Sequence, residues 1–116
     1  MLRVSIIMAT YNRASTVVRA IMSIEGQSYP DIQLIVVDGA SDDDTVSLVE
    51  PLLGHGDVLI SEPDKGIYDA LNKGLELATG EIIAFLHSDD LYSDVDVISK
   101  VVEQFSDNSI DAVYGD

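Results

Sequence analysis

The sequence predicts an α/β fold, with a mostly parallel sheet and helices on both of its faces. Short, nearly continuous apolar runs are typical of strands that are buried on both sides of a parallel sheet. Segments with apolar residues at helical spacing alternate with these runs, and polar residues gather where the predicted strands end. A repeated strand–helix order favours parallel pairing, because each helix carries the chain back to the same end of the sheet.

Each predicted strand is a short apolar run that ends at polar residues or a glycine-containing turn. The run at residues 33–37 ends at Asp38, and the weakest run follows the turn at Gly54 to Gly56. The expected strands cover residues 4–8, 33–37, 58–60 and 81–86, and a fifth begins at Ala112.

The predicted helices are amphipathic and have recognisable ends. Gly26 and Pro30 stop the first helix, and Gly80 stops the third. Ser41 and Asp44 suggest a capping box for the second. The expected helices cover residues 17–24, 45–53, 67–78 and 97–105.

Composition limits the function classes. The chain has 116 residues, enough for one domain with a core, and 47% of them are hydrophobic. The chain has six Lys and Arg residues and 21 Asp and Glu residues, so its net charge is -15. This negative charge argues against binding to nucleic acid or to anionic membranes. The absence of cysteine excludes disulfides, zinc–thiolate sites and thiol catalysis. No apolar run is long enough to span a membrane and no signal peptide precedes the first strand, so we expect a soluble, cytoplasmic chain.

The polar residues that follow the strands converge on one place. In open parallel sheets, ligands bind beyond the carboxyl ends of the strands. This rule brings together residues 10–13, 38–44, 62–66 and 87–90. Within the last group, Asp89 and Asp90 would repel each other without a cation, and carboxylates suit Mg²⁺ or Mn²⁺. The alternative is that one of them caps the next helix, but Asp94 is better placed to do so, which favours the metal hypothesis.

The other candidates each have a structural alternative. Asp38 could accept hydrogen bonds from a base or a ribose, or close a turn with Gly39, and the two roles are compatible. Tyr11 could stack on a base, and the helix start near Ala14 offers backbone amides to an anion. Arg13 and Lys65 suit a phosphate, and the alternative for both is a surface ion pair. We expect surface ion pairs for Lys73, helix N-terminal roles for residues 42–44, and structural roles for His55 and His87.

Four ordered blocks of this sequence resemble family 2 glycosyltransferases, in the branch that builds bacterial surface polysaccharides. The blocks are Val4 to Arg13; Gln27 to Pro30 with Leu34 to Thr45; Glu62 to Gly74; and Ala78 to Tyr92. Walker, Gly-x-Gly-x-x-Gly and nucleophile-elbow motifs are absent, which disfavours P-loop enzymes, dinucleotide oxidoreductases and α/β-hydrolases.

The resemblance implies the Rossmann-like nucleotide-binding half of a GT-A domain and a metal-dependent, inverting glycosyltransferase. The donor would be a nucleotide-diphospho-sugar, by family default a UDP-sugar, and the acceptor a saccharide or lipid-linked saccharide. The metal, Mn²⁺ or Mg²⁺, would bind Asp89 and Asp90. The residues implied at the donor are Thr10, Tyr11, Asn12, Arg13, Asp38, Lys65, Asp69, Ser88 and Asp89.

Departures from the family pattern define the alternatives. Gly39 stands where many members carry a second acid, and His87 stands where an acid or amide is common. No residue matches the family's general base, because the family's domain is longer, so we expect a single domain that is truncated at its C-terminus. A half-domain would expose a sheet edge and apolar surface, which favours self-association.

A non-catalytic nucleotide-sugar-binding module is the main alternative to an enzyme. A response-regulator-like domain is disfavoured, because Thr10 to Asn12 replace its acidic pair and its lysine after the fifth strand is absent.

Overall fold

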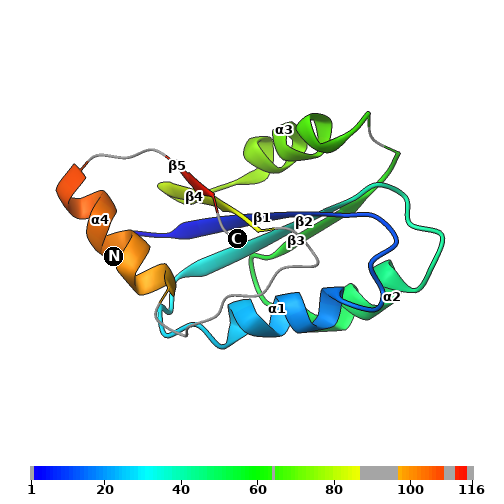
Figure 1. The fold of residues 1–116 in the computed structure, drawn as a ribbon, viewed down its shortest axis with the longest axis horizontal. Helices are drawn as coiled ribbons and strands as arrows, with labels where there is room; N and C mark the ends of the chain where they lie inside the picture. The colour runs from blue at the N-terminus through cyan, green and yellow to red at the C-terminus, as the bar shows by residue number, and fades with distance from the viewer. Residues whose placement is uncertain (1, 64, 87–96, 109–111, 115–116) are drawn as a thin grey trace.

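The fold is a five-stranded, fully parallel sheet with helices on both faces (Figure 1). The structure, a computed structural model, describes residues 2–63, 65–86, 97–108 and 112–114. The strand order is β3-β2-β1-β4-β5. The predicted α/β class and the parallel pairing are therefore confirmed.

Strands and helices alternate strictly along the chain. The strands are β1 (Val4–Thr10), β2 (Ile32–Asp38), β3 (Val58–Ser61), β4 (Ile82–Phe85) and β5 (Ala112–Tyr114). The helices are α1 (Val17–Glu25), α2 (Thr45–Val49), the short 3₁₀ helix η1 (Glu50–Leu52), α3 (Ile67–Leu77) and α4 (Val97–Asn108). Each predicted segment is present, with strand ends shifted by one or two residues.

The second helix is the one that differs from expectation. A single helix over residues 45–53 was predicted, but α2 ends at Val49 and η1 continues the chain. Pro51 explains the break, because proline has no backbone N–H to donate to the preceding turn. The predicted capping box is also wrong. Asp44 occupies the N-cap position but makes no side-chain cap hydrogen bond, and Ser41 is engaged elsewhere.

Two apolar layers cover the sheet. Alternate residues of a strand face opposite sides, so Ile6 and Met8 join one core while Ile7 joins the other. α1, α2 and α4 contribute to the first core. Of the described helices, α3 alone covers the second face, where Ala70 packs with Ile7 (Figure 1).

The strand order reverses at β1, which lies between β2 and β4. The chain passes from β1 to β2 over the α1 face and reaches β4 over the α3 face. In open parallel sheets, ligands usually bind beyond the carboxyl ends of the strands next to such a switch point.

At the other end of the sheet, β4 meets β1 through a tight contact at Gly80. Its N–H donates to the Ser5 hydroxyl (2.9 Å), and that hydroxyl donates to the buried Gln33 side chain (2.7 Å). A Cβ at Gly80 would lie 2.6 Å from the Arg3 carbonyl oxygen and 2.7 Å from Ser5 Oγ. Only glycine fits this close approach without a shift of the backbone.

Candidate functional site

Three adjacent strands end in polar residues that lie side by side. Thr10 of β1 pairs with Asp38 of β2, and Asp38 pairs with Ser61 of β3. The ladder continues into the loops, since Gly39 N–H donates to the Thr10 carbonyl (2.9 Å) and Glu62 N–H donates to the Asp38 carbonyl (2.9 Å). The loops that follow these strands therefore start from one shared edge.

Asp38 is the buried centre of this edge, with 0% of the residue exposed. One carboxylate oxygen accepts hydrogen bonds from Ser41 N–H (2.8 Å) and the Ser61 hydroxyl (2.8 Å). The other accepts the Ser41 hydroxyl at 2.5 Å. The turn expected at Asp38 is thus closed by Ser41, and the carboxylate binds protein donors.

Ser41 also joins the loop after β2 to the loop after β1. Its hydroxyl oxygen accepts a hydrogen bond from Asn12 N–H (2.8 Å). The Asn12 side-chain oxygen in turn accepts from Asp42 N–H (2.7 Å). Asn12 and Ala40 both have positive φ angles, of 50° and 62°. Asparagine tolerates this conformation, whereas alanine is strained there. The side chain of Asn12 is therefore used to hold the two loops together.

A second tie runs from α2 to the start of α1. Arg13 N–H donates to Thr45 Oγ1 (2.9 Å), and Ala14 N–H donates to Asp43 Oδ2 (3.2 Å). The amides expected to be available to an anion near Ala14 are thus partnered by protein groups. Asp43 also accepts the Thr45 hydroxyl, and this hydrogen bond lowers the pKa of Asp43 below its ordinary value.

Three side chains at the end of β1 and in the loop that follows it remain available to a ligand. Thr10 is only 6% exposed, and its hydroxyl has no hydrogen-bond partner among the described residues. A buried hydroxyl without a partner is costly and marks a place where a bound group can supply one. Tyr11 is 54% exposed, and Arg13 is exposed as well. One buried polar group at the end of β1 therefore lies next to an aromatic ring and a cation in the loop that follows.

The β3–α3 loop carries a compact set of charges. Lys73 Nζ lies 3.0 Å from Glu62 Oε1 and 3.3 Å from Asp69 Oδ2. Asp69 Oδ2 also accepts Lys65 N–H (3.1 Å), and this hydrogen bond is the main cause that lowers the pKa of Asp69. The hydrogen bond to Glu62 raises the pKa of Lys73. The expected ion-pair role of Lys73 is confirmed.

The predicted metal ligands, Asp89 and Asp90, lie outside the described residues. The predicted donor residue Ser88 and the neighbouring His87 lie outside them as well. Within the described ranges, no group of three or more His, Cys, Asp or Glu residues could hold a metal ion. In the same part of the chain, no helix is long and apolar enough to cross a membrane.

Ser41 and Ser61 are the site residues that sequence reasoning missed. The contact of Ser61 with Asp38 depends on the side-by-side ends of β2 and β3, and the contact of Ser41 with Asn12 depends on the meeting of the loops after β1 and β2. The contact between Asp69 and Lys73 did leave a signal, because residues four apart on a helix are neighbours. The contact between Lys73 and Glu62 left no comparable signal in the sequence.

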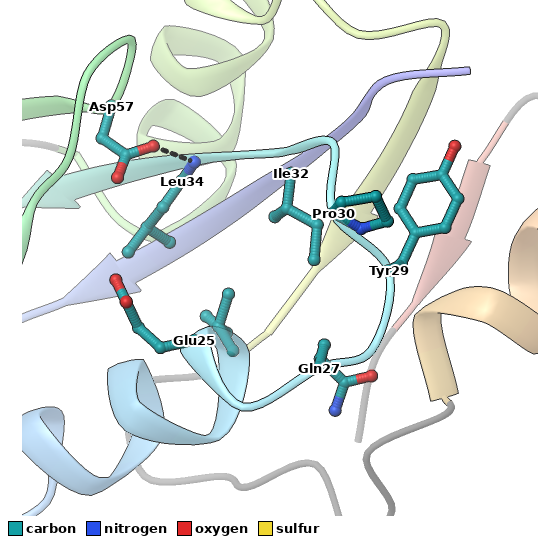
Figure 2. Close-up of a pocket in the computed structure, with 8 residues that line it drawn as sticks. Glu25, Gln27, Tyr29, Pro30, Ile32, Leu34 and Asp57 are labelled. Atoms are coloured by element: carbon teal, nitrogen blue, oxygen red, sulfur yellow. Dashed lines mark hydrogen bonds between the residues drawn. The ribbon is translucent and has the colours of Figure 1, made fainter. Parts of the chain in front are cut away.

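A pocket of about 230 Å³ lies at the opposite end of β2 (Figure 2). Of its two acidic residues, Glu25 and Asp57, the second accepts hydrogen bonds from two backbone donors, Leu34 N–H (2.8 Å) and Gly54 N–H (2.8 Å). It contains none of the predicted site residues. Its lining consists of Ile24, Glu25, Gln27, Tyr29, Pro30, Ile32, Leu34 and Asp57.

Comparisons with known proteins agree on one family. The model of Glycosyl transferase family 2 matches residues 5–116. A PGL/p-HBAD biosynthesis glycosyltransferase of Mycobacterium bovis is 36% identical over 116 residues, covering 97% of this chain and 45% of the relative. An uncharacterized glycosyltransferase of Mycobacterium tuberculosis is 39% identical over 107 residues, covering 89% of this chain and 40% of the relative. The chain thus spans less than half the length of these relatives.

Solved structures share the fold. A mannosyltransferase from Pyrobaculum calidifontis, in complex with GDP-Man and Mn²⁺, aligns with a TM-score of 0.84 and 33% identity. The alignment covers 94% of this chain and 34% of that structure. Staphylococcus aureus TarS, in complex with UDP-GlcNAc, aligns with a TM-score of 0.84 at 23% identity, over 93% of this chain and 32% of TarS. At this lower identity, the likeness to TarS shows the fold alone.

Proposed function

Because the chain belongs to glycosyltransferase family 2, we propose that it forms the donor-binding part of an enzyme that transfers a sugar from a nucleotide-diphospho-sugar. The acceptor is a hydroxyl group of a saccharide or lipid-linked saccharide, in the assembly of a polysaccharide. The match of the family to residues 5–116 carries this proposal. It is supported by the mannosyltransferase bound to GDP-Man and Mn²⁺, which is 33% identical to this chain.

We assign the nucleoside to the loop after β1. The exposed ring of Tyr11 suits stacking on a planar base. The buried Thr10 hydroxyl, which lacks a partner among the described residues, is free to donate to the nucleoside. Asp38 acts at the same place in one of two ways. Its carboxylate accepts a hydrogen bond from the base or ribose in place of the one from the Ser41 hydroxyl, or it holds Ser41 and, through it, Asn12 in position.

The donor phosphates require positive charge, because the chain carries a net charge of -15. Arg13 and Lys65 are exposed residues in the loops after β1 and β3, and both suit a diphosphate. Asp69 accepts the backbone N–H of Lys65 and thereby belongs to the same group.

We assign the metal to Asp89 and Asp90, with Ser88 beside the sugar-phosphate. Adjacent carboxylates form an oxygen donor set, which fits Mg²⁺ or Mn²⁺. A divalent cation held there would neutralise the diphosphate and stabilise it as it departs.

The transfer is a single displacement with inversion. The acceptor oxygen forms a bond to the anomeric carbon of the sugar while the bond from that carbon to the diphosphate oxygen breaks. The nucleoside diphosphate leaves with the electron pair, and the acceptor proton passes to a general base that we do not assign within this chain. The described residues contribute binding and orientation of the donor, which lowers the barrier by holding the reacting atoms in place.

A calorimetric titration with UDP, GDP, dTDP and CDP, each with Mn²⁺ and then with EDTA, tests the proposal. We expect one nucleotide to bind in a metal-dependent manner, and the double variant Asp89→Ala/Asp90→Ala to lose this binding. The variant Asp94→Ala removes a nearby acid without removing the pair, so it should bind as the wild type does. Binding that persists in EDTA and in the double variant would contradict the metal assignment. Sugar transfer or donor hydrolysis distinguishes an enzyme from a module that only binds.

A further inference from the structure

A lysine in α3 is tied to the loop that precedes this helix. Lys73 Nζ lies 3.0 Å from the Glu62 carboxylate and donates to the Pro63 carbonyl oxygen (3.3 Å). Glu62 is the first residue after β3, and its own N–H extends the ladder to Asp38. The ammonium group therefore attaches the start of the loop to the second turn of the helix.

The same ammonium group reaches the end of the loop through Asp69. Nζ lies 3.3 Å from Asp69 Oδ2, and that oxygen accepts the backbone N–H of Lys65 (3.1 Å). Between Lys65 and the helix stands Gly66, whose φ of 109° suits glycine. Both ends of the loop thus converge on one cation.

Two lysines of this region have different surroundings. The side chain of Lys73 is 21% exposed and is occupied by two carboxylates and a carbonyl. Lys65 is exposed, and it forms no ion pair with any described residue. One lysine therefore organises the loop, and the other remains available at its surface.

We propose that Lys73 is a positioning residue that fixes the β3–α3 loop and so presents the side chain of Lys65 to the donor diphosphate. This inference rests on the proposed function, which assigns Lys65 to the donor phosphates. Without the ammonium group, Glu62 and Asp69 would face each other as like charges, and the loop would lose the tie at both of its ends. The donor would then have to order the loop as it binds.

The variant Lys73→Met tests this, because methionine keeps an unbranched apolar stem and removes the charge. Lys73→Arg keeps the charge. Arg19→Met is the matched control, since it also removes one cation but lies on α1, on the opposite face of the sheet. Two quantities are measured for each protein: the dissociation constants of GDP and UDP with Mn²⁺, and the hydrogen-exchange rate of the Lys65 amide.

For Lys73→Met we expect a dissociation constant about tenfold higher, the scale of ordering one long side chain with its loop. The Lys65 amide should exchange faster, and the difference from wild type should shrink at high salt, which screens charge interactions. Lys73→Arg should keep most of the affinity, and Arg19→Met should match the wild type. A merely structural role in packing would not depend on salt or be rescued by arginine.

The outcomes separate the two proposals. If the wild type binds none of UDP, GDP, dTDP and CDP, the donor assignment fails, and the Lys65 amide alone then decides whether Lys73 fixes the loop. If that amide is as protected in a folded Lys73→Met variant as in the wild type, the inference is overturned. An unchanged dissociation constant in Lys73→Met, with binding intact in the wild type, overturns it equally.

Discussion

The substitution Ser41→Ala removes the contact that joins two loops at the candidate site. Two hydrogen bonds are lost: the one that the hydroxyl donates to Asp38 at 2.5 Å and the one that it accepts from Asn12 N–H at 2.8 Å. The bond from Ser41 N–H to Asp38 is kept, because it belongs to the backbone. The effect therefore reports on the hydroxyl group alone.

The expected loss of stability follows from these partners. A hydrogen bond to a charged group contributes about 1.5–3 kcal/mol, and one between neutral groups about 0.5–1.5 kcal/mol. Asn12 is exposed, so water replaces the second bond in part, whereas Asp38 is fully buried and finds no substitute. We therefore expect a decrease in the free energy of unfolding of about 2–3 kcal/mol.

Urea denaturation monitored by circular dichroism measures this change. Ser47→Ala is the control: its hydroxyl is exposed and donates only to the nearby Asp44 carbonyl (2.9 Å), so its effect should stay within about 0.5 kcal/mol. If Ser41→Ala and Ser47→Ala lower the midpoint equally, at the same slope, the argument that Asp38 depends on Ser41 is wrong. Nucleotide affinity should fall as well, since Asn12 loses its anchor.

Two further predictions concern Gly80 and Asp43. Gly80→Ala should lower the free energy of unfolding by about 1–3 kcal/mol, because the added Cβ would lie 2.6 Å from the Arg3 carbonyl oxygen. Gly54→Ala is the control, because its Cβ meets nothing closer than 3.6 Å. Equal urea midpoints for the two variants would refute the steric argument. For Asp43, the hydrogen bond from Thr45 lowers the pKa below 3.8, so its stabilising effect is present above that ordinary value and is lost as the pH falls through the lowered pKa. The stability difference between wild type and Asp43→Asn, measured by urea denaturation from pH 7 to pH 2.5, should thus be largest near neutral pH and should not grow as the pH falls. A difference that grows in acid would show the opposite sign of coupling.

The strands and their alternation with helices could be predicted because burial on both faces leaves an unbroken apolar run. Residues 34–37 show this, and all of them are buried in β2. The extent of α2 could not be predicted from its apolar spacing, which continues past Pro51. The missing N–H of that proline ends the α-helix, and η1 follows.

The candidate site was predictable in part. The rule that ligands bind beyond the strand ends, applied to the predicted strands, brought Thr10 and Asp38 to one edge, where the structure pairs them. The sequence could not reveal that Ser41 would bond to Asp38 instead of capping α2, because its hydroxyl also accepts a hydrogen bond from Asn12 N–H, where the loops after β1 and β2 meet. Asp89 and Asp90 as metal ligands remain a prediction, since they lie outside the described residues.

The position of β1 also bears on the order in which the protein folds. Val4 pairs with Ile32, 28 residues away, and with Ile82, 78 residues away. Closing the longer loop costs roughly 1 kcal/mol more chain entropy, since this cost grows with the logarithm of loop length. We expect strands β1, β2 and β3 to associate first, and β4 to pair later with the edge of β1 that is still unpaired. The switch point between β1 and β4 therefore forms only in the second of these stages.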